Sequence, residues 1–435
     1  MTEYKVDIDQ LRVGVFIRLD MKWFSHPFLV NSFKITNPSM IETLREIGLK
    51  SVVCLPEKSD VLPYPPKKEI VTVPPAGDSE PLSNEMKKLW EEKRERIEQL
   101  KKRRENMAQC ERRFESGVGM VKNVMRNIHT GSPKSIEEAD VLMRDLIESL
   151  MVDKESSVQL MNTELGSQNV FYHSLNVSVL SMILGREYGL DPGQLRILGL
   201  GALFHDIGKN RVPKNILTKT DPLTPAETSF LQLHPKYGEE IVSQTPSFPK
   251  ESADIVLHHH ERWDGKGYPD QLTGNKISVL TRIASIANIY DNYCNRLDPR
   301  DSLTPYEALS RMFAKERDTF DENLLALFIQ CLGIYPPGTI VKLSNGLIGI
   351  VITVTRHNPL RPSIVVYDPL IPKDEALIYD LRDDPNLFIE RSIRPLHLDP
   401  EIFEYLSPRT RITYYIADSE SVAPTAKTGQ FPGPK

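Results

Sequence analysis

The spacing of hydrophobic and polar residues first separates a short N-terminal region from the rest of the chain. Residues 1–62 contain one helical pattern, which starts at Pro38 and is stopped by Gly48. Strand-like runs of apolar residues start at Val13, Phe28 and Lys50. We therefore predict a small α/β domain over residues 1–62.

The next two segments differ sharply in composition. Residues 63–82 are rich in proline and lack periodicity, which indicates an extended linker. Residues 83–130 are densely charged and carry a narrow apolar stripe at helical spacing. The stripe consists of Met86, Leu89, Trp90, Ile97 and Leu100. We predict a charged connecting helix, which either relays signals and mediates a homodimer or is only a solvated connector.

Helical periodicity dominates residues 131–335, and we predict an almost wholly helical domain there. One helix is expected behind a cap at Ser135. A strongly apolar helix contains His173 and ends at Gly189, and another covers Leu280 to Tyr293. Further helices are expected around the other histidines of this region.

The pattern changes to strand-like alternation after residue 336, with Ser344-Asn345-Gly346 as a hairpin turn. We predict a small β subdomain over residues 336–417. The polar tail at 418–435 contains proline and glycine and is expected to be disordered.

Composition narrows the range of partners and locations. The net charge of −5 gives no basic field for a nucleic acid polymer. No segment approaches the roughly 20 apolar residues of a membrane-spanning helix, and the N-terminus lacks a signal-peptide pattern. The cysteines are far apart, and we interpret them as reduced thiols of a cytoplasmic protein. They are Cys54, Cys110, Cys294 and Cys331.

The candidate chemistry lies in the helical region, where His205 and Asp206 end an apolar run. A neutral nitrogen beside a hard carboxylate oxygen suits a divalent metal ion. Further histidines lie on separate segments, as in a multi-ligand metal site inside a helical core. They are His173, His234, His258, His259 and His260.

These residues, read with the segment from His259 to Pro269, resemble the HD-GYP family of the HD phosphohydrolase superfamily. The similarity covers roughly residues 155–330. Its motifs are His173-Ser174-Leu175-Asn176, His205-Asp206-Ile207-Gly208-Lys209, His234-Pro235, His259-His260-Glu261 and Gly267-Tyr268-Pro269. Residues 1–62 resemble a small domain of unassigned function that often precedes HD-GYP domains.

The resemblance implies a mainly α protein. It consists of an HD-type helical bundle with a small N-terminal α/β domain, a charged connecting helix and a small C-terminal β subdomain. The resemblance also implies two divalent metal ions, which are iron or manganese in family members. The first ion would be bound by His173, His205 and Asp206. Asp206 would bridge to the second ion, which would be held by His234, His259 and His260.

The resemblance assigns further residues to the substrate. Lys209 would stabilise charge on the scissile phosphate or help to protonate the leaving oxygen. Tyr268 would face the substrate, or its loop would only brace the metal site. Arg296 and Arg300 lie near, though about one residue from, the positions of phosphate-binding basic residues in the family. Surface arginines without a role are the alternative.

Two positions depart from the family pattern. Asn288 stands where the family has an acidic ligand of the first metal. Its amide oxygen is a candidate ligand of that metal, but it lacks the charge of a carboxylate and binds transition metals weakly. The second acid of that motif is retained as Asp291. Asn169 stands where some members have a glutamate for a third metal, so a two-metal site is expected.

Two functions remain open from the sequence. The resemblance implies a phosphodiesterase that hydrolyses the bacterial second messenger cyclic di-GMP to linear pGpG, GMP or both, and related members accept cyclic GMP-AMP dinucleotides. The alternative is a weakly active or non-catalytic receptor for cyclic di-GMP, or a module that binds signalling proteins. Asn288 favours the alternative, whereas the nearly intact histidine and Gly-Tyr-Pro motifs favour the enzyme.

Overall fold

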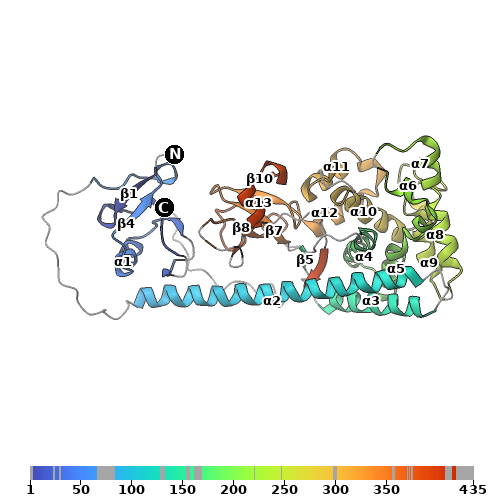
Figure 1. The fold of residues 1–435 in the computed structure, drawn as a ribbon, viewed down its shortest axis with the longest axis horizontal. Coiled ribbons are helices and arrows are strands. Elements are labelled where there is room, and N and C mark those ends of the chain that lie inside the picture. Colours follow the sequence, from blue (N-terminus) through green and yellow to red (C-terminus); the bar gives the residue numbers. More distant parts are fainter. Residues whose placement is uncertain are drawn as a thin grey trace. The chain divides into compact units, whose positions relative to one another are not determined.

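The structure, a computed structural model, describes most of the chain (Figure 1). The described residues are 3–22, 25–28, 31–65, 84–127, 133–152, 157–160, 169–219, 221–245, 247–296, 301–354, 358–369, 371, 373, 376–406 and 414–417. Most of the predicted linker and the whole predicted tail lie outside them. The chain divides into two compact units, residues 1–102 with 368–377 and residues 103–367 with 378–435.

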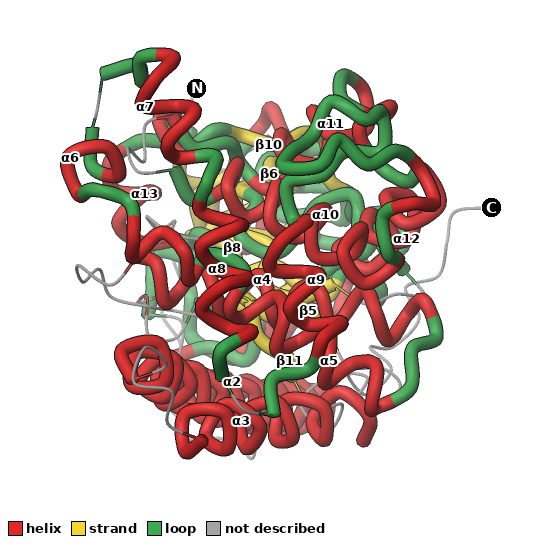
Figure 2. The backbone as a smooth tube through the Cα atoms, turned by 90° about the vertical axis from the view of Figure 1, so that its right-hand side faces the viewer, coloured by secondary structure: helices red, strands yellow, loops and turns green. Residues whose placement is uncertain are grey.

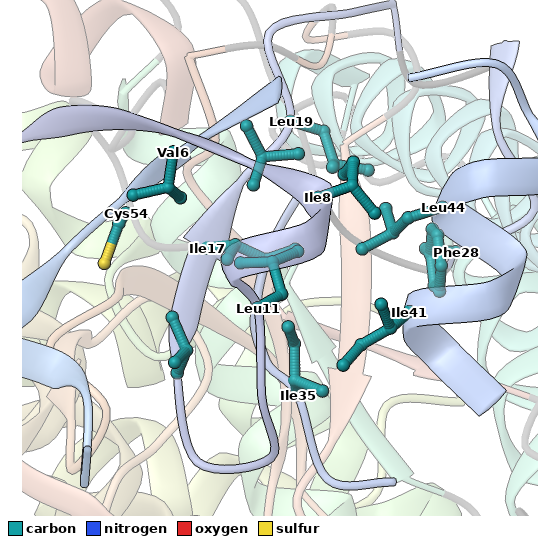
Figure 3. Packing of buried hydrophobic residues seen from close by; sticks show 12 residues of the cluster. Val6, Ile8, Leu11, Ile17, Leu19, Phe28, Ile35, Ile41, Leu44 and Cys54 are labelled. Atoms are coloured by element: carbon teal, nitrogen blue, oxygen red, sulfur yellow. The ribbon is translucent and has the colours of Figure 1, made fainter. Parts of the chain in front are cut away.

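The first unit is built on a four-stranded antiparallel sheet with the strand order β1-β4-β2-β3. The strands are β1 (Tyr4–Asp7), β2 (Phe16–Arg18), β3 (Ser32–Lys34) and β4 (Ser51–Cys54). Helix α1 (Pro38–Glu46) starts at the cap Asn37, whose side chain accepts a hydrogen bond from the Met40 N–H. Figure 3 shows Ile17 of the sheet and Leu44 of the helix in one apolar core.

The α/β character of this unit is confirmed, but two strands differ from the prediction. β1 precedes the first predicted strand, and β3 follows the apolar run at Phe28 instead of containing it. Phe28 is buried in the core and lies outside any strand. A three-residue apolar run marks burial, and it is too short to distinguish a strand from a buried turn.

The charged connecting helix is confirmed as α2 (Asn84–Asn127). Earlier in the chain, the first unit also contains two short 3-10 helices, Ile8–Gln10 and Pro56–Lys58. Residues up to 102 belong to the first unit, and the later ones to the second. The predicted apolar stripe is not continuously buried, because Met86 is buried whereas Ile97 is 39% exposed.

The second unit contains the expected helical bundle (Figure 2). Its helices are α3 (Pro133–Val152), α4 (Asn169–Tyr188), α5 (Pro192–Phe204), α6 (Lys214–Leu217), α7 (Pro225–Leu231), α8 (His234–Ser243), α9 (Lys250–His258), α10 (Val279–Cys294), α11 (Pro305–Ala314) and α12 (Glu322–Leu332). The connecting 3-10 helices are Ile207–Arg211, Gly274–Lys276 and Arg317–Thr319. Gly189, with φ +98°, follows α4 as predicted, whereas α3 starts before Ser135, which is therefore not its cap.

A seven-stranded sheet forms the rest of the second unit. Its strands are β5 (Ser157–Leu160), β6 (Ile340–Leu343), β7 (Ile348–Val354), β8 (Ser363–Val366), β9 (Leu377–Asp380), β10 (Ile389–Ile393) and β11 (Tyr414–Ala417). The path β10-β6-β7-β5-β11 is antiparallel, and β8 pairs with β7 and β9. The 3-10 helix Pro395–His397 and helix α13 (Pro400–Leu406) precede β11.

The β6–β7 hairpin confirms the predicted turn, where Gly346 has φ +86°. β5 was not predicted, since residues 131–335 were expected to be helical. It joins the C-terminal sheet between β7 and β11, and both of these strands come much later in the sequence. The overall fold class is confirmed. Among the residues that the structure describes, no helix is both long and apolar enough to cross a membrane.

Candidate metal centre

Four helices of the second unit, α4, α5, α8 and α9, carry the predicted histidine and aspartate ligands or border them in the chain (Figure 2). His173 lies in α4, and the pair His205-Asp206 directly follows α5. His234 is the first residue of α8, and the pair His259-His260 follows α9. α5 packs against both α4 and α9, and α9 also packs against α8. The candidate ligands on these segments therefore come close together.

Gly208 permits the close crossing of two of these segments. A Cβ atom at this position would overlap the carbonyl of His234, so the chain after Asp206 runs directly over the first turn of α8. This crossing places the Asp206 Oδ1 atom 3.3 Å from the His234 Nε2 atom. Glycine is therefore required by the backbone contact beside the site.

The candidate ligand atoms form two groups that share one carboxylate. The first group is His173, His205 and Asp206. The second group is Asp206, His234, His259 and His260. Within each group, every residue offers a ligand atom within 4.8 Å of the others.

Hydrogen bonds to backbone carbonyls fix the protonation of three histidines. The Nδ1 atoms of His205, His234 and His259 lie 2.7, 2.7 and 2.8 Å from the carbonyl oxygens of Ala202, Leu231 and Val256. A carbonyl oxygen only accepts hydrogen bonds, so each Nδ1 carries the proton. The Nε2 lone pair of each ring is then free and points into the site.

These Nε2 lone pairs face one another at short distances. His234 and His259 approach with their Nε2 atoms 3.2 Å apart, and His173 and His205 with theirs 3.1 Å apart. Two nitrogens on one metal ion at about 2.1 Å are separated by about 3.0–3.4 Å. Burial lowers the pKa values of His205 and His259, which disfavours a proton between the rings. The arrangement therefore fits metal cations.

Asp206 lies between the two groups with one oxygen toward each. Its Oδ2 atom is 3.4 and 3.6 Å from the Nε2 atoms of His205 and His173. Its Oδ1 atom faces His234 and, within the described part of the chain, is buried without a hydrogen-bond partner. Burial alone would raise the pKa of this carboxyl, but the Lys209 ammonium holds it well below its usual value. The carboxylate is therefore charged and has a free acceptor oxygen.

α10 supplies the departure from the family pattern. Asn288 is buried, and its Oδ1 atom accepts a 2.7 Å hydrogen bond from the Asn292 side chain. One turn later, Asp291 accepts a 2.6 Å hydrogen bond from the Nδ1 atom of His173. A carboxylate in this position orients the imidazole and makes it a better ligand. Sequence reasoning did not give Asp291 this role, although its spacing from Asn288 was the available signal.

The structure places two of the predicted substrate residues at the two groups. The Lys209 Nζ atom donates a 2.6 Å hydrogen bond to Asp206 Oδ2, and its side chain is 31% exposed. The Tyr268 ring stacks on His260 with centroids 4.6 Å apart and an interplanar angle of 21°. Burial raises the pKa of Tyr268, so its hydroxyl is protonated at neutral pH.

Other predicted residues lie outside the two groups or outside the described residues. Arg296 is exposed, with its guanidinium 5.5 Å from the Tyr293 ring. Arg300 and the side chain of Asn169 are outside the described residues. His258 contacts Asp254 and Asp270 through its two ring nitrogens, at 2.8 and 3.1 Å, and belongs to neither group.

Family profiles match three successive parts of the chain. Residues 3–139 match a domain of unknown function (DUF3391), and residues 146–324 match the HD domain. Residues 340–399 match a KOW domain associated with the HD domain. The site described above falls wholly within the HD-domain match.

Characterised relatives are similar over different lengths. A cyclic di-GMP phosphodiesterase of Pseudomonas aeruginosa is 28% identical over 365 residues, which cover 83% of this chain and 84% of that protein. A cyclic di-GMP phosphodiesterase response regulator of Xanthomonas campestris is 33% identical over 33% of this chain and 39% of that protein. A 3'3'-cGAMP-specific phosphodiesterase of Vibrio cholerae is 28% identical over 43% of this chain and 35% of that protein.

Proposed function

Because this chain belongs to the HD-GYP family of HD-domain proteins, we propose that it is a metal-dependent phosphodiesterase that hydrolyses cyclic di-GMP. The observation that carries this proposal is Asp206, a charged and buried carboxylate with one oxygen toward each of two histidine groups. Such a donor set suits two divalent ions that share one carboxylate. The relatives described above are named as phosphodiesterases of cyclic dinucleotides, which supports the choice of substrate.

The two groups would hold ions of iron or manganese. His173, His205 and Asp206 form a set of two histidines and one carboxylate, which is typical of non-haem iron sites. The second group adds three imidazoles to the same carboxylate. When bound, such ions supply Lewis acidity toward a water molecule and a phosphoryl oxygen.

The protein's own residues would orient the substrate and handle charge and protons. In the reaction, a water oxygen bonds to phosphorus as the bond to the 3′ oxygen breaks, and that oxygen takes up a proton. The Lys209 ammonium lies on Asp206, where it can stabilise the phosphoryl oxygens or donate to the departing oxygen. Tyr268 supplies an aromatic surface beside His260. One cleavage gives linear pGpG, and a second gives GMP.

A second candidate function rests on Asn288. We propose as the alternative a weakly active or non-catalytic protein that binds cyclic di-GMP or signalling proteins. Asn288 is uncharged, and its side-chain oxygen already accepts a hydrogen bond from Asn292. The first group therefore has Asp206 as its one carboxylate among the described residues. Restoring an acid at position 288 distinguishes the two functions.

Location and assembly extend the same proposal. A cytoplasmic location suits a second-messenger substrate and the buried free thiols of Cys54, Cys294 and Cys331. A homodimer through α2 stays a prediction from its apolar stripe.

The proposal is tested by incubating the purified full chain with cyclic di-GMP and Mn²⁺, or with Fe²⁺ under anaerobic conditions. Products are separated by chromatography, and the double variant His205→Ala/Asp206→Ala is the control. We expect pGpG or GMP from the native chain and neither from the control. Absence of product from folded, metal-loaded native protein would contradict the enzyme and favour the receptor, which binding of cyclic di-GMP would then reveal.

A further inference from the structure

His260 differs from the other histidines of the two groups in how its ring is held. His205, His234 and His259 each donate from Nδ1 to a backbone carbonyl, and His173 donates to Asp291. Among the described residues, the His260 ring makes no such hydrogen bond. Metal-binding histidines are usually oriented by a hydrogen bond from the second ring nitrogen. The orientation of His260 must therefore come from another contact.

The rings of His234 and His259 contact the His260 ring at an angle. The ring of Tyr268 instead stacks on the face of His260 and limits its rotation. The two rings are nearly parallel, at 21°, with their centroids 4.6 Å apart. The Tyr268 N–H also donates a 3.3 Å hydrogen bond to the His260 carbonyl, so the two residues are joined at the backbone. Tyr268 thus restricts the rotation of the His260 ring only if its own position is fixed.

Glu261 fixes the loop that carries Tyr268. Its side chain is buried, with 3% of the residue exposed. One carboxylate oxygen accepts a 2.6 Å hydrogen bond from the Asp270 N–H, and the other accepts a 3.0 Å bond from the Leu272 N–H. Hydrogen bonds from backbone donors to a buried carboxylate are strong and directional. Both bonds lie just beyond Tyr268 and draw the loop back onto the His259-His260-Glu261 segment.

Two further features keep this loop in the same place. A side chain on Gly267 would come within 2.6 Å of the His260 carbonyl oxygen, so the loop and the histidine segment are in direct backbone contact. From the other side, the His258 Nε2 atom lies 3.1 Å from a carboxylate oxygen of Asp270. The loop is therefore held in place at Gly267 and at Asp270.

We infer that Glu261 is a positioning residue that orients the His260 imidazole for metal binding through the loop and the stacked ring of Tyr268. This inference rests on the proposed metal centre. Glu261 belongs to neither ligand group among the described residues. Glu261 therefore acts on the metal only indirectly. Substituting it should change the metal affinity of the group that contains His260 and leave the affinity of the other group unchanged.

The test is a competition titration of the full chain with Mn²⁺ against a chelator, which resolves the two groups. The site lost in His234→Ala identifies the group of interest. We expect Glu261→Gln to weaken that site about tenfold, since replacing residues that orient metal ligands typically costs 10–100-fold. The amide keeps the size of the side chain but turns an NH₂ toward one of the two N–H donors. The other group serves as an internal reference.

Variants of Tyr268 provide a second, independent test in the same titration. Tyr268→Ala should weaken the same site by a similar factor, whereas Tyr268→Phe keeps the stacked ring and should keep the affinity. Lys266→Ala is the matched control in the same loop, because its side chain is 78% exposed. If Glu261→Gln fails to fold, as judged by circular dichroism, the Tyr268 pair alone decides.

The outcomes separate this inference from the proposal on which it rests. If His260→Ala leaves Mn²⁺ affinity unchanged, the proposed metal centre itself is wrong. If His260→Ala weakens the site while Glu261→Gln and Tyr268→Ala do not, the centre stands and the positioning role is overturned. A loss in both groups in Glu261→Gln would show general disruption and would also overturn it.

Discussion

Asp206 is the residue on which both ligand groups depend, because it is the carboxylate that they share. Burial disfavours its charge, yet the Lys209 ammonium keeps its pKa well below the usual value. The carboxylate is therefore ready for cations at neutral pH without releasing a proton. Lys209 is the residue that stabilises this charge most directly, through a 2.6 Å hydrogen bond.

Substitution of Lys209 tests its part in the reaction. Lys209→Gln should lower kcat for cyclic di-GMP by about 100-fold, because a donor aimed at developing charge is lost. Metal content should persist, since all ligand candidates remain. Lys214→Gln, at an exposed position on α6, is the control. An unchanged kcat in Lys209→Gln would remove this residue from the mechanism.

Position 288 tests the departure from the family pattern. Asn288→Asp adds a buried carboxylate one turn before Asp291, and it should raise the Mn²⁺ affinity of the His173 group by about tenfold. The affinity is measured by chelator competition, and hydrolysis of cyclic di-GMP is followed in parallel. Asn215→Asp adds the same charge at an exposed position on α6 and serves as the control. No gain in either quantity would show that the amide does not limit the site.

The sequence identifies the candidate ligands because metal binding requires particular residue types, and the motif supplies their order. It does not reveal how each ring is oriented. The partners of His205 and His259 are backbone carbonyls, which every residue possesses. Glu261 likewise bonds to backbone N–H groups 9 and 11 residues later, which no side-chain pattern marks.

Helix α2 contains a buried lysine that its charged sequence pattern does not reveal. Lys93 is one of many charged residues in this helix, but it is 1% exposed and its Nζ donates a 2.6 Å hydrogen bond to the His26 carbonyl. Burial lowers its pKa to about 7. A charged side chain is normally assigned to the solvent face, so periodicity alone could not identify this buried position.

The lowered pKa makes the first unit's stability dependent on pH. Between about pH 7 and the ordinary lysine pKa of about 10.4, the unfolded chain binds more protons than the folded one, so stability rises with pH. The slope is at most about 1.4 kcal/mol per pH unit. Below pH 7 both states are protonated at Lys93, and its contribution to the slope vanishes.

Urea unfolding of the full chain at pH 7, 8.5 and 10, followed by tryptophan fluorescence, measures this slope. Lys93→Met should abolish the rise in stability that the native chain shows over this range. Lys87→Met, at an exposed position on the same helix, should leave the rise intact. Equal slopes in all three proteins would contradict the burial of an uncharged lysine.

Periodicity predicted best those elements whose pattern is long or is ended by a glycine. α4 ends just before Gly189, and the β6–β7 hairpin turns at Gly346, and both glycines have positive φ. β5 was missed because four residues carry too little alternation to outweigh the helical pattern around them. Its pairing with β7 and β11 is set by tertiary contacts.

At the scale of the whole molecule, the family matches and the compact units suggest a revised division. The first family match covers residues 3–139, and the first compact unit includes residues up to 102. We propose that the N-terminal domain extends from the predicted 1–62 into α2, where Lys93 packs on it. The HD domain would then follow, with residues 336–417 and β5 as the C-terminal subdomain.

The metal content of the folded chain tests the central claim most directly. After loading with Mn²⁺ and dialysis, elemental analysis should find about two ions per native chain. His173→Ala and His234→Ala should each retain about one ion, and Asp206→Ala should retain close to none. Folded native protein without bound metal, or an Asp206→Ala variant that keeps both ions, would contradict the account.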